Sequence, residues 1–332
     1  MKKRVLPAIV AASMFGLVGC QPSSEQASDD QTFEIEQAKI AVESRPLSPP
    51  LARFDLGSLP EFFDCVREEG GTVLASHRGG PAPGYPENGL ETLEYASLNA
   101  TPIHEIDVAE SRDGVLFLLH DNSLGRTTTG DGQVSDTDWD EIATLNLVDN
   151  SGQITPFTPP KLSDVLLWAK QTGAVVELDK KRTTSYRNII SHVRAAGAEQ
   201  NVILISYTDE QAIEIARLAP DLMMTASVNS PEHQAELEAA GVDMTKVIAW
   251  TGISNPNDRA WKALGRRDIE SAFGTLGRPG ERLDDQYIAD GDLSEFQTLV
   301  DGGLTLLATD EVYAVADFLT ADEDALERCA VG

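Results

Sequence analysis

The chain has 332 residues, with 26 Lys and Arg against 54 Asp and Glu, and its formal net charge is −28. This charge excludes most nucleic-acid binders, because a polyphosphate partner requires a basic surface. Hydrophobic residues make up 41% of the chain, as in a folded α/β protein, and three cysteines are too few for a disulfide scaffold.

The first twenty residues have the pattern of a bacterial export signal. A basic start at residues 2–4 precedes an uncharged run, Val5–Val18, that is too short to span a bilayer as a mature helix. The small residues before Cys20 resemble a lipobox, so we expect residues 1–19 to be a lipoprotein signal peptide and Cys20 to carry lipid. The alternative is an ordinary signal peptide with a chance Cys. The prediction is a protein anchored to the cell envelope and facing the periplasm, with Gln21 favouring the outer membrane.

Residues 20–50 are polar and rich in proline, which is typical of a flexible tether between a lipid anchor and a domain. The domain is expected over residues 51–332. If Cys20 is acylated, Cys65 and Cys329 remain. In an oxidising compartment they either pair, joining the beginning of the domain to its end, or stay as free thiols.

From residue 51 onward, short apolar runs alternate with helical patterns. This alternation predicts a parallel sheet with crossover helices, and eight such runs fit a (β/α)8 TIM barrel. A doubly wound open sheet is the alternative, but no glycine-rich dinucleotide-binding turn is present. The expected strands are Thr72–Ser76, Pro102–Asp107, Ala174–Leu178, Val202–Ser206, Leu222–Ala226, Val247–Trp250, Ile269–Phe273 and Leu304–Ala308.

One further run, Val115–Leu119, follows the second strand too closely for a crossover helix. It predicts a β-hairpin excursion after strand 2. A turn centred on Asp113-Gly114 would place Asp107 opposite His120, and the hairpin would thereby bring a histidine beside the acids of strand 2.

Acidic residues gather at the strand ends, where TIM barrels carry their active sites. Glu105 and Asp107 are two residues apart on one strand and so point the same way. Paired carboxylates repel each other unless a cation holds them, and oxygen ligands suit Mg²⁺ or Ca²⁺. Glu177, on the next barrel strand, can supply a third carboxylate.

Two histidines, His77 and His120, are expected at the same end of the barrel. One imidazole can accept a proton while the other donates one to a leaving oxygen. Arg78 can bind phosphate oxygens in a bidentate way. With a divalent cation, these groups suit cleavage of a phosphodiester.

These residues form a series of short motifs that resembles the glycerophosphodiester phosphodiesterase family, closely over residues 72–182 and loosely beyond. The motifs are His77-Arg78-Gly79, Pro86-Glu87-Asn88, Glu105-Ile106-Asp107, Asp113-Gly114, His120-Asp121, Arg126-Thr127-Thr128, Glu177 and Ala308-Thr309-Asp310.

The resemblance implies a barrel enzyme that uses one divalent cation, Ca²⁺ or Mg²⁺, to hydrolyse small glycerophosphodiesters to an alcohol and glycerol 3-phosphate. Matched motif by motif, it implies catalytic roles for His77 and His120, metal ligation by Glu105, Asp107 and Glu177, phosphate binding by Arg78, and a site-bracing role for Glu87 and Asn88. The last two residues would otherwise simply cap the following helix.

The chain departs from the family at Asp179, where a Glu-x-Lys motif normally has its Lys. Asp179 is then either a further metal ligand or a group that binds a substrate hydroxyl. Strand alternation points Lys180 away from the site, so the Lys180-Lys181-Arg182 run is expected to be a solvated strand exit. The site would then lack one phosphate anchor.

Two regions nearer the C-terminus bear on specificity. Trp250 is either a wall of the substrate site or a core residue, and residues 274–292 are expected to lie over the barrel mouth. Two alternative functions remain: a lysophospholipase D acting on lysolipids, and a non-catalytic solute-binding or scaffold lipoprotein.

Overall fold

The computed structural model describes residues 56–319 and 321–330. The expected signal peptide, the lipidation residue Cys20 and the tether up to residue 50 lie outside these residues. Among the described residues, no helix combines the length and apolar character needed to cross a membrane.

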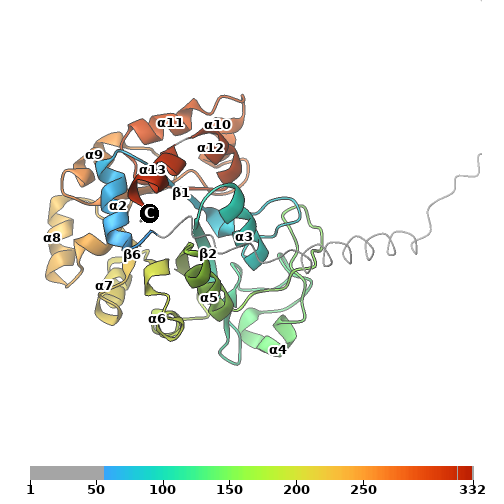
Figure 1. Ribbon diagram of the computed structural model, residues 1–332. Coiled ribbons are helices and arrows are strands. Elements are labelled where there is room, and N and C mark those ends of the chain that lie inside the picture. Colours follow the sequence, from blue (N-terminus) through green and yellow to red (C-terminus); the bar gives the residue numbers. More distant parts are fainter. Residues whose placement is uncertain (1–55, 320, 331–332) are drawn as a thin grey trace, which may run out of the picture. The chain divides into compact units, whose positions relative to one another are not determined.

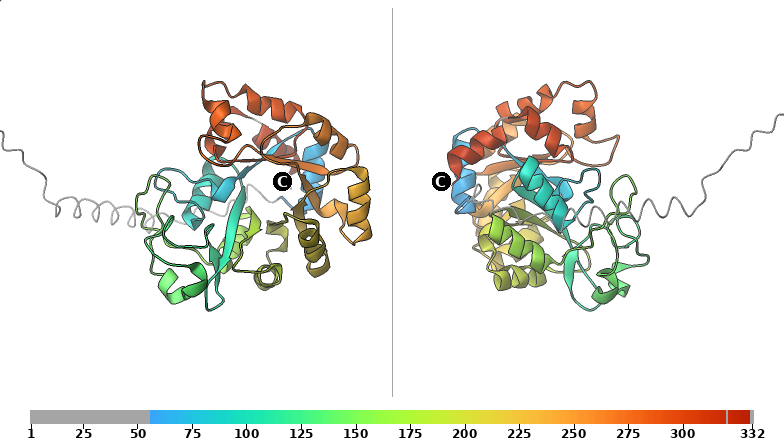
Figure 2. Two further views of the ribbon diagram at one scale, coloured as in Figure 1. Left: turned by 180° about the vertical axis from the view of Figure 1, so that it is seen from behind. Right: turned by 45° about the vertical axis from the view of Figure 1, so that its right-hand side comes forward.

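Eight parallel strands close into a barrel, with helices around the outside (Figures 1 and 2). The ring closes where the first strand pairs with the second through Ser76 and His104. This confirms the predicted TIM barrel and excludes the open sheet. The barrel strands are β1 (Val73–Ser76), β2 (Ile103–Glu110), β4 (Val175–Lys180), β5 (Val202–Ile205), β6 (Met223–Ala226), β7 (Val247–Trp250), β8 (Glu270–Gly274) and β9 (Leu306–Thr309).

The helices form because each carries an apolar face that packs on the barrel and a polar face toward solvent. Several begin at a Ser, Thr or Asn cap, as at Thr208, whose side chain accepts a hydrogen bond from the amide of Gln211. They are α2 (Leu59–Glu68), α3 (Leu90–Asn99), α4 (Trp139–Ile142), α5 (Leu162–Thr172), α6 (Tyr186–Ala196), α7 (Asp209–Leu218), α8 (Pro231–Ala239), α9 (Asp258–Gly265), α10 (Leu283–Ile288), α11 (Ser294–Asp301), α12 (Val312–Phe318) and α13 (Ala321–Cys329).

The hairpin excursion after β2 is present: β3 (Leu116–Leu118) runs antiparallel to β2. Its register differs by one residue from the prediction, because Ala109 faces Phe117 and the amide of Leu119 donates to the carbonyl of Asp107. The turn spans three residues between Ser111 and Val115 and not two, with Gly114 at φ 90°. The excursion, in green in Figure 1, includes α4 and has a small apolar core of its own.

Strand alternation divides the barrel strands into an outer and an inner face. On β2, Ile106 and Val108 pack outward against helices, whereas Ile103 joins the apolar barrel interior. The odd-numbered residues that follow Ile103 therefore point inward too, toward the carboxyl ends of the strands. We call that end of the barrel the upper end and the opposite end the lower end.

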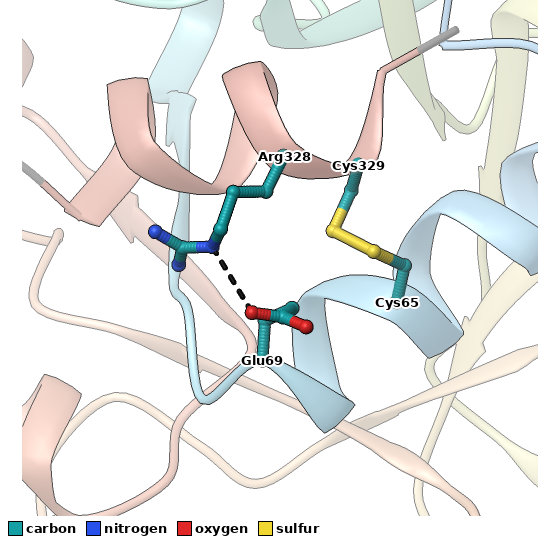
Figure 3. The surroundings of a disulfide bond; sticks show 4 residues. All are labelled: Cys65, Glu69, Arg328 and Cys329. Carbon is teal, nitrogen blue, oxygen red and sulfur yellow. Dashed lines mark ion pairs between the residues drawn. A yellow bond between two sulfur atoms is a disulfide. The ribbon is translucent and has the colours of Figure 1, made fainter.

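The lower end is sealed by α2 and α13. Phe62, Phe63 and Val66 of α2, together with Ala325 of α13, belong to the same apolar cluster as the barrel interior. Figure 3 shows how a disulfide between Cys65 and Cys329 joins the two helices, with an Arg328–Glu69 ion pair of 3.2 Å beside it. The pairing alternative for these cysteines is therefore the one observed. It links positions 264 residues apart in the chain.

Candidate active site

The first group of the site lies in the turn after β1. Arg78 has φ 51° and Gly79 φ 83°, so the chain reverses sharply, and a Cβ on Gly79 would lie 2.5 Å from a methyl group of Leu93. The reversal turns the Arg78 amide toward the barrel axis, where it donates to Glu105 Oε2 at 2.8 Å. A left-handed arginine is strained, and here the strain serves to aim a backbone donor at a site carboxylate.

His77 is held by a carboxylate from the other end of the sequence. Its Nδ1 lies 2.6 Å from Asp310 Oδ1. Asp310 is fixed in turn by Arg282 at 2.8 Å and by the amide of Gly277 at 3.0 Å. Burial opposes ionisation of Asp310, but the bond to His77 outweighs it and lowers the pKa of Asp310 to about 2. An ionised carboxylate only accepts hydrogen bonds, so His77 carries its proton on Nδ1 and leaves Nε2 for the pocket.

His120 is held in the same way. Its Nδ1 lies 2.7 Å from Asp121 Oδ1, and Arg126 binds Asp121 at 2.6 Å. The hydrogen bond from Arg126 is the main reason that the pKa of Asp121 lies well below its usual range. Each histidine is therefore oriented by a carboxylate that an arginine stabilises, and each presents Nε2 for proton transfer.

Glu87 and Asn88 connect these groups to the acids. Glu87 accepts hydrogen bonds from Arg78 at 3.1 Å and from Arg126 at 2.8 Å. Asn88 donates to Asp107 Oδ2 at 2.6 Å and accepts from the Asp107 amide at 2.9 Å. The residue before α3 is Gly89, and no side chain caps this helix, so the geometry favours the bracing role of Glu87 and Asn88 over the capping alternative.

Four carboxylates enter the barrel from β2 and β4. The two strands pair with Glu105 beside Glu177 and with Asp107 beside Asp179. Burial, followed by the charge of Asp107, raises the pKa of Glu105. Burial raises the pKa of Glu177 to about 7. Glu105 and Glu177 are hard to ionise because burial removes the water that would stabilise their charge, whereas Lys181 and the other cations around Asp107 outweigh burial and lower the pKa of Asp107.

Three of the four acids could hold one metal ion. Glu105, Asp107 and Asp179 each offer an oxygen within 4.8 Å of the others. Asp179 Oδ1 is buried and accepts no hydrogen bond, and Asp107 Oδ1 is buried with the Lys181 ammonium as its partner. Buried carboxylate oxygens at this spacing suit Ca²⁺ or Mg²⁺. Glu177 lines the same pocket but lies outside this group of three.

Lys181 is the main difference from the expected site. Lys180 points away, with its ammonium 5.4 Å from the Tyr186 ring centroid, as strand alternation requires. Lys181, however, is not part of a solvated exit: its Nζ lies 2.5 Å from Asp107 Oδ1 and 2.6 Å from Asp179 Oδ2. β4 ends at Lys180, but the Lys181 amide still bonds to the Val108 carbonyl of β2, so Lys181 continues the inward alternation of Glu177 and Asp179. The site therefore does contain an inward lysine.

These groups line a pocket of about 330 Å³ at the upper end of the barrel. One side carries both histidines, the four acids and Lys181. The opposite side is apolar and is formed by Ile205, Trp250, Ile253, Leu276 and Ala308. Trp250 lines the pocket and also packs on the barrel core, so its position is compatible with both alternatives.

The chain was compared with known proteins once this geometry was established. The model of the glycerophosphoryl diester phosphodiesterase family matches residues 77–250, just over half of the chain. The chain belongs to this family. The predictions of the family and of a phosphoric diester hydrolase are thereby confirmed.

Individual relatives agree with the family match. The Bacillus subtilis protein YqiK is 28% identical over 214 residues, covering 63% of this chain and 88% of YqiK. Human glycerophosphodiester phosphodiesterase 1 is 34% identical over 121 residues, about a third of each chain.

Solved family structures share the barrel. The Parabacteroides distasonis phosphodiesterase superposes with a TM-score of 0.68 at 24% identity, over 84% of this chain and 94% of that one. An Oleispira antarctica phosphodiesterase, solved with sn-glycerol-3-phosphate, has a TM-score of 0.56 at 19% identity, over 79% and 99% of the two chains.

Within this family member, seven of the predicted site residues line one pocket, and Arg78, Glu87 and Asn88 are hydrogen-bonded to them or to each other. Sequence reasoning gave no role in the site to Lys181 or Arg282, and it named Asp310 only as part of a family motif. Asp310 follows the last strand directly, so the rule that strand ends carry function was a sufficient signal for it. Arg282 lies in the segment expected over the mouth, and no sequence pattern marks it.

Proposed function

We propose that this protein is a divalent-cation-dependent glycerophosphodiester phosphodiesterase whose products are an alcohol and glycerol 3-phosphate. The observation that carries the proposal is the pair of carboxylate-oriented histidines, His77 and His120, beside the cluster of Glu105, Asp107 and Asp179. The Oleispira antarctica relative was solved with sn-glycerol-3-phosphate as its product, which supports this substrate class.

In the proposed mechanism the histidines move the protons. One Nε2 takes the proton of the attacking hydroxyl, either water or the 2-hydroxyl of the substrate glycerol. The other Nε2 gives a proton to the alcohol oxygen as its bond to phosphorus breaks. Attack by the glycerol hydroxyl gives a cyclic phosphate, which water then opens by the same proton transfers.

The remaining groups bind and orient the phosphate. A divalent cation held by Glu105, Asp107 and Asp179, with Glu177 beside them, would polarise the phosphate and neutralise charge in the transition state. The Arg78 guanidinium lies 3.1 Å from Glu87. Burial opposes its positive charge, but the surrounding carboxylates outweigh burial and raise the pKa of Arg78. Arg78 therefore keeps a fixed positive charge near the phosphate position.

A substrate panel tests the proposal. Glycerophosphocholine and glycerophosphoethanolamine should each release glycerol 3-phosphate in the presence of Ca²⁺ or Mg²⁺. Release of free choline from glycerophosphocholine shows that the bond on the alcohol side was cut. Intact diesters under all conditions, or phosphocholine as the product, would contradict the proposal.

A second candidate function is a lysophospholipase D. It is favoured by the apolar side of the pocket, where Ile253 is 41% exposed and Tyr207, on the neighbouring rim, 64% exposed. Exposed apolar groups at a pocket mouth suit an acyl chain. Lysophosphatidylcholine should be included in the panel, and Ile253→Asp is expected to reduce its hydrolysis more than that of glycerophosphocholine.

We also propose that the protein is exported and lipid-anchored through Cys20 to the bacterial envelope, facing the periplasm. The lipobox-like sequence supports this, and so does the Cys65–Cys329 disulfide, because disulfides persist in oxidising compartments. Cell fractionation tests it: the wild-type protein should sediment with membranes, and Cys20→Ser should not. Equal distributions of the two would contradict anchoring.

A further inference from the structure

Lys181 enters the pocket from the first residue after β4. Its amide donates to the Val108 carbonyl at 3.0 Å, which continues the contact with β2 and turns the side chain inward. The side chain is only 17% exposed, although a lysine normally keeps its ammonium in water. Lys180, its neighbour, lies outside the barrel over Tyr186.

The ammonium of Lys181 is bound by the carboxylates of the candidate metal cluster. It lies 2.5 Å from Asp107 Oδ1 and 2.6 Å from Asp179 Oδ2. Tyr207 donates its hydroxyl hydrogen to the same Asp179 oxygen at 2.8 Å. Two of the three acids in the cluster therefore share one positive charge that belongs to the chain.

A divalent ion in the cluster and this ammonium would be held by the same two carboxylates, Asp107 and Asp179. Ca²⁺ and Mg²⁺ bind carboxylate oxygens at about 2.0–2.6 Å. The Lys181 ammonium occupies two of these oxygens at nearly the same distance. Two cations held between the same pair of carboxylates would repel each other strongly in a pocket with little water.

We propose that Lys181 is a tethered counter-cation that neutralises Asp107 and Asp179 when no divalent ion is bound and competes with the ion for their oxygens. The inference rests on the cation dependence of the proposed function. It predicts two effects of Lys181. The ion-free protein is more stable with Lys181 than without it, and the protein binds the divalent ion more weakly than it would if the acids had no lysine beside them.

Titration calorimetry with CaCl₂ and MgCl₂ on chelator-stripped protein tests the proposal. Lys181→Met is compared with Lys180→Met, which removes the same charge on the outer side of the barrel and so controls for net charge. Loss of two charge-assisted contacts should tighten ion binding roughly tenfold or more in Lys181→Met. Lys180→Met should bind the ion like the wild type.

Thermal unfolding provides the second measurement. Without ion, Lys181→Met should melt below Lys180→Met, and saturating Ca²⁺ should raise its melting temperature by more. Equal or weaker ion binding in Lys181→Met would overturn the counter-cation role alone, because the ion would still bind. Failure of the wild type and both variants to bind either ion would overturn both this inference and the proposed cation dependence.

Discussion

The two ends of the barrel are built on opposite principles. At the lower end, α2 and α13 place phenylalanine and aliphatic side chains over the strand starts, and a disulfide joins the two helices. At the upper end, the same strands deliver four buried carboxylates to one pocket. The groups that stabilise the fold therefore lie at one end of the barrel, and the groups of the candidate site lie at the other. Substitutions at the lower end should mainly reduce stability, and those at the upper end should mainly reduce activity.

The buried acids at the two ends differ in their partners. Burial raises the pKa of Glu270, near the lower end, to about 7, but Glu270 accepts a hydrogen bond from Arg67 at 2.9 Å. Burial raises the pKa of Glu177, at the upper end, to about 7, and within residues 56–319 and 321–330 its carboxylate forms no ion pair. Natural proteins retain such unfavourable burial mainly where a ligand later compensates for it.

The largest expected effect is on catalysis at the upper end. His77→Asn and His120→Asn should each lower kcat by about 10²- to 10⁴-fold, the usual contribution of a general acid or base. The thermal stability should change little, because both rings line the pocket. Steady-state kinetics measure the loss, and His192→Asn on the outer side of α6 is the matched control.

A substrate with an easier leaving group separates the two roles. A glycerophosphodiester of p-nitrophenol needs little protonation of its leaving oxygen. The variant that lacks the general acid should therefore recover most of its activity on this substrate, whereas the variant that lacks the base should not. Full activity of either variant on glycerophosphocholine would contradict the two-histidine mechanism.

The next effect is on stability at the lower end. Cys65→Ser with Cys329→Ser removes a cross-link over most of the chain and should lower the free energy of unfolding by about 2–5 kcal/mol. The kcat at 25 °C should be retained, since the pocket lies at the other end. Urea unfolding gives the stability, and the same samples give the activity.

The exposed ion pair beside the disulfide is the control for this double variant. Arg328 and Glu69 are about half exposed, so Glu69→Ala should cost no more than about 1 kcal/mol. A double cysteine variant as stable as the wild type, or one that loses activity in proportion to stability, would contradict the separation of the two ends.

A third expectation concerns the buried acid Glu177. Its folded pKa, about 7, lies above its unfolded value, so the folded state holds the proton more tightly. The associated stability is fully present below pH 4.5 and is lost as pH rises through 7. Ion-free Glu177→Gln should be more stable than the wild type by roughly 3 kcal/mol at pH 8, with little difference at pH 4.5.

Chemical denaturation at both pH values measures this difference. Glu61→Gln, on the exposed side of α2, is the lower-end control and should show no such pH dependence. A Glu177→Gln variant that is no more stable than the wild type at pH 8 would contradict a free-energy cost of burying this carboxylate at the upper end.

The smallest effect is expected from a residue that acts through His77. Asp310→Asn should lower kcat about 10- to 100-fold, because the imidazole loses the acceptor that fixes its proton on Nδ1. Asp310 has its pKa lowered to about 2, so its stabilising charge is present above pH 3.8 and lost as pH falls through 2. Because Asp310 also raises the pKa of His77, Asp310→Asn should shift the pH–rate profile between pH 5 and 9 to lower pH.

Asp285→Asn is the matched control, since Asp285 also binds Arg282, at 3.0 Å, but does not contact His77. A kinetic loss in Asp285→Asn equal to that in Asp310→Asn would show that Arg282 alone matters. Rate profiles across this pH range provide the measurement.

The sequence predicted the barrel strands closely because they are short apolar runs that alternate regularly with helical patterns. The run Val247–Trp250 coincides with β7, and the others differ from the observed strands by a few residues at their ends. The hairpin register was wrong by one residue. Its turn type depends on the backbone at Gly114, and the pattern Asp113-Gly114 is compatible with both two- and three-residue loops.

The site was predictable wherever it lies on a strand. Glu105, Asp107 and Glu177 follow from alternation, and Lys181 is in phase with Glu177 although it lies one residue beyond β4. Arg282 does not follow from alternation, because it lies in a loop, where the direction of the side chain depends on how the chain leaves the barrel. The grouping of Asp179 with Glu105 and Asp107 required the pairing of β2 with β4, which no single-strand pattern contains.

The central claim is that the upper end of the barrel hydrolyses phosphodiesters by means of a divalent cation. Phosphorus NMR tests it most directly, with chelator-stripped protein and glycerophosphocholine in one tube. The account predicts no change until Ca²⁺ or Mg²⁺ is added, then replacement of the diester signal by that of glycerol 3-phosphate, and arrest on excess chelator. Hydrolysis by the stripped protein in excess chelator, or an unchanged diester with both ions, would contradict it.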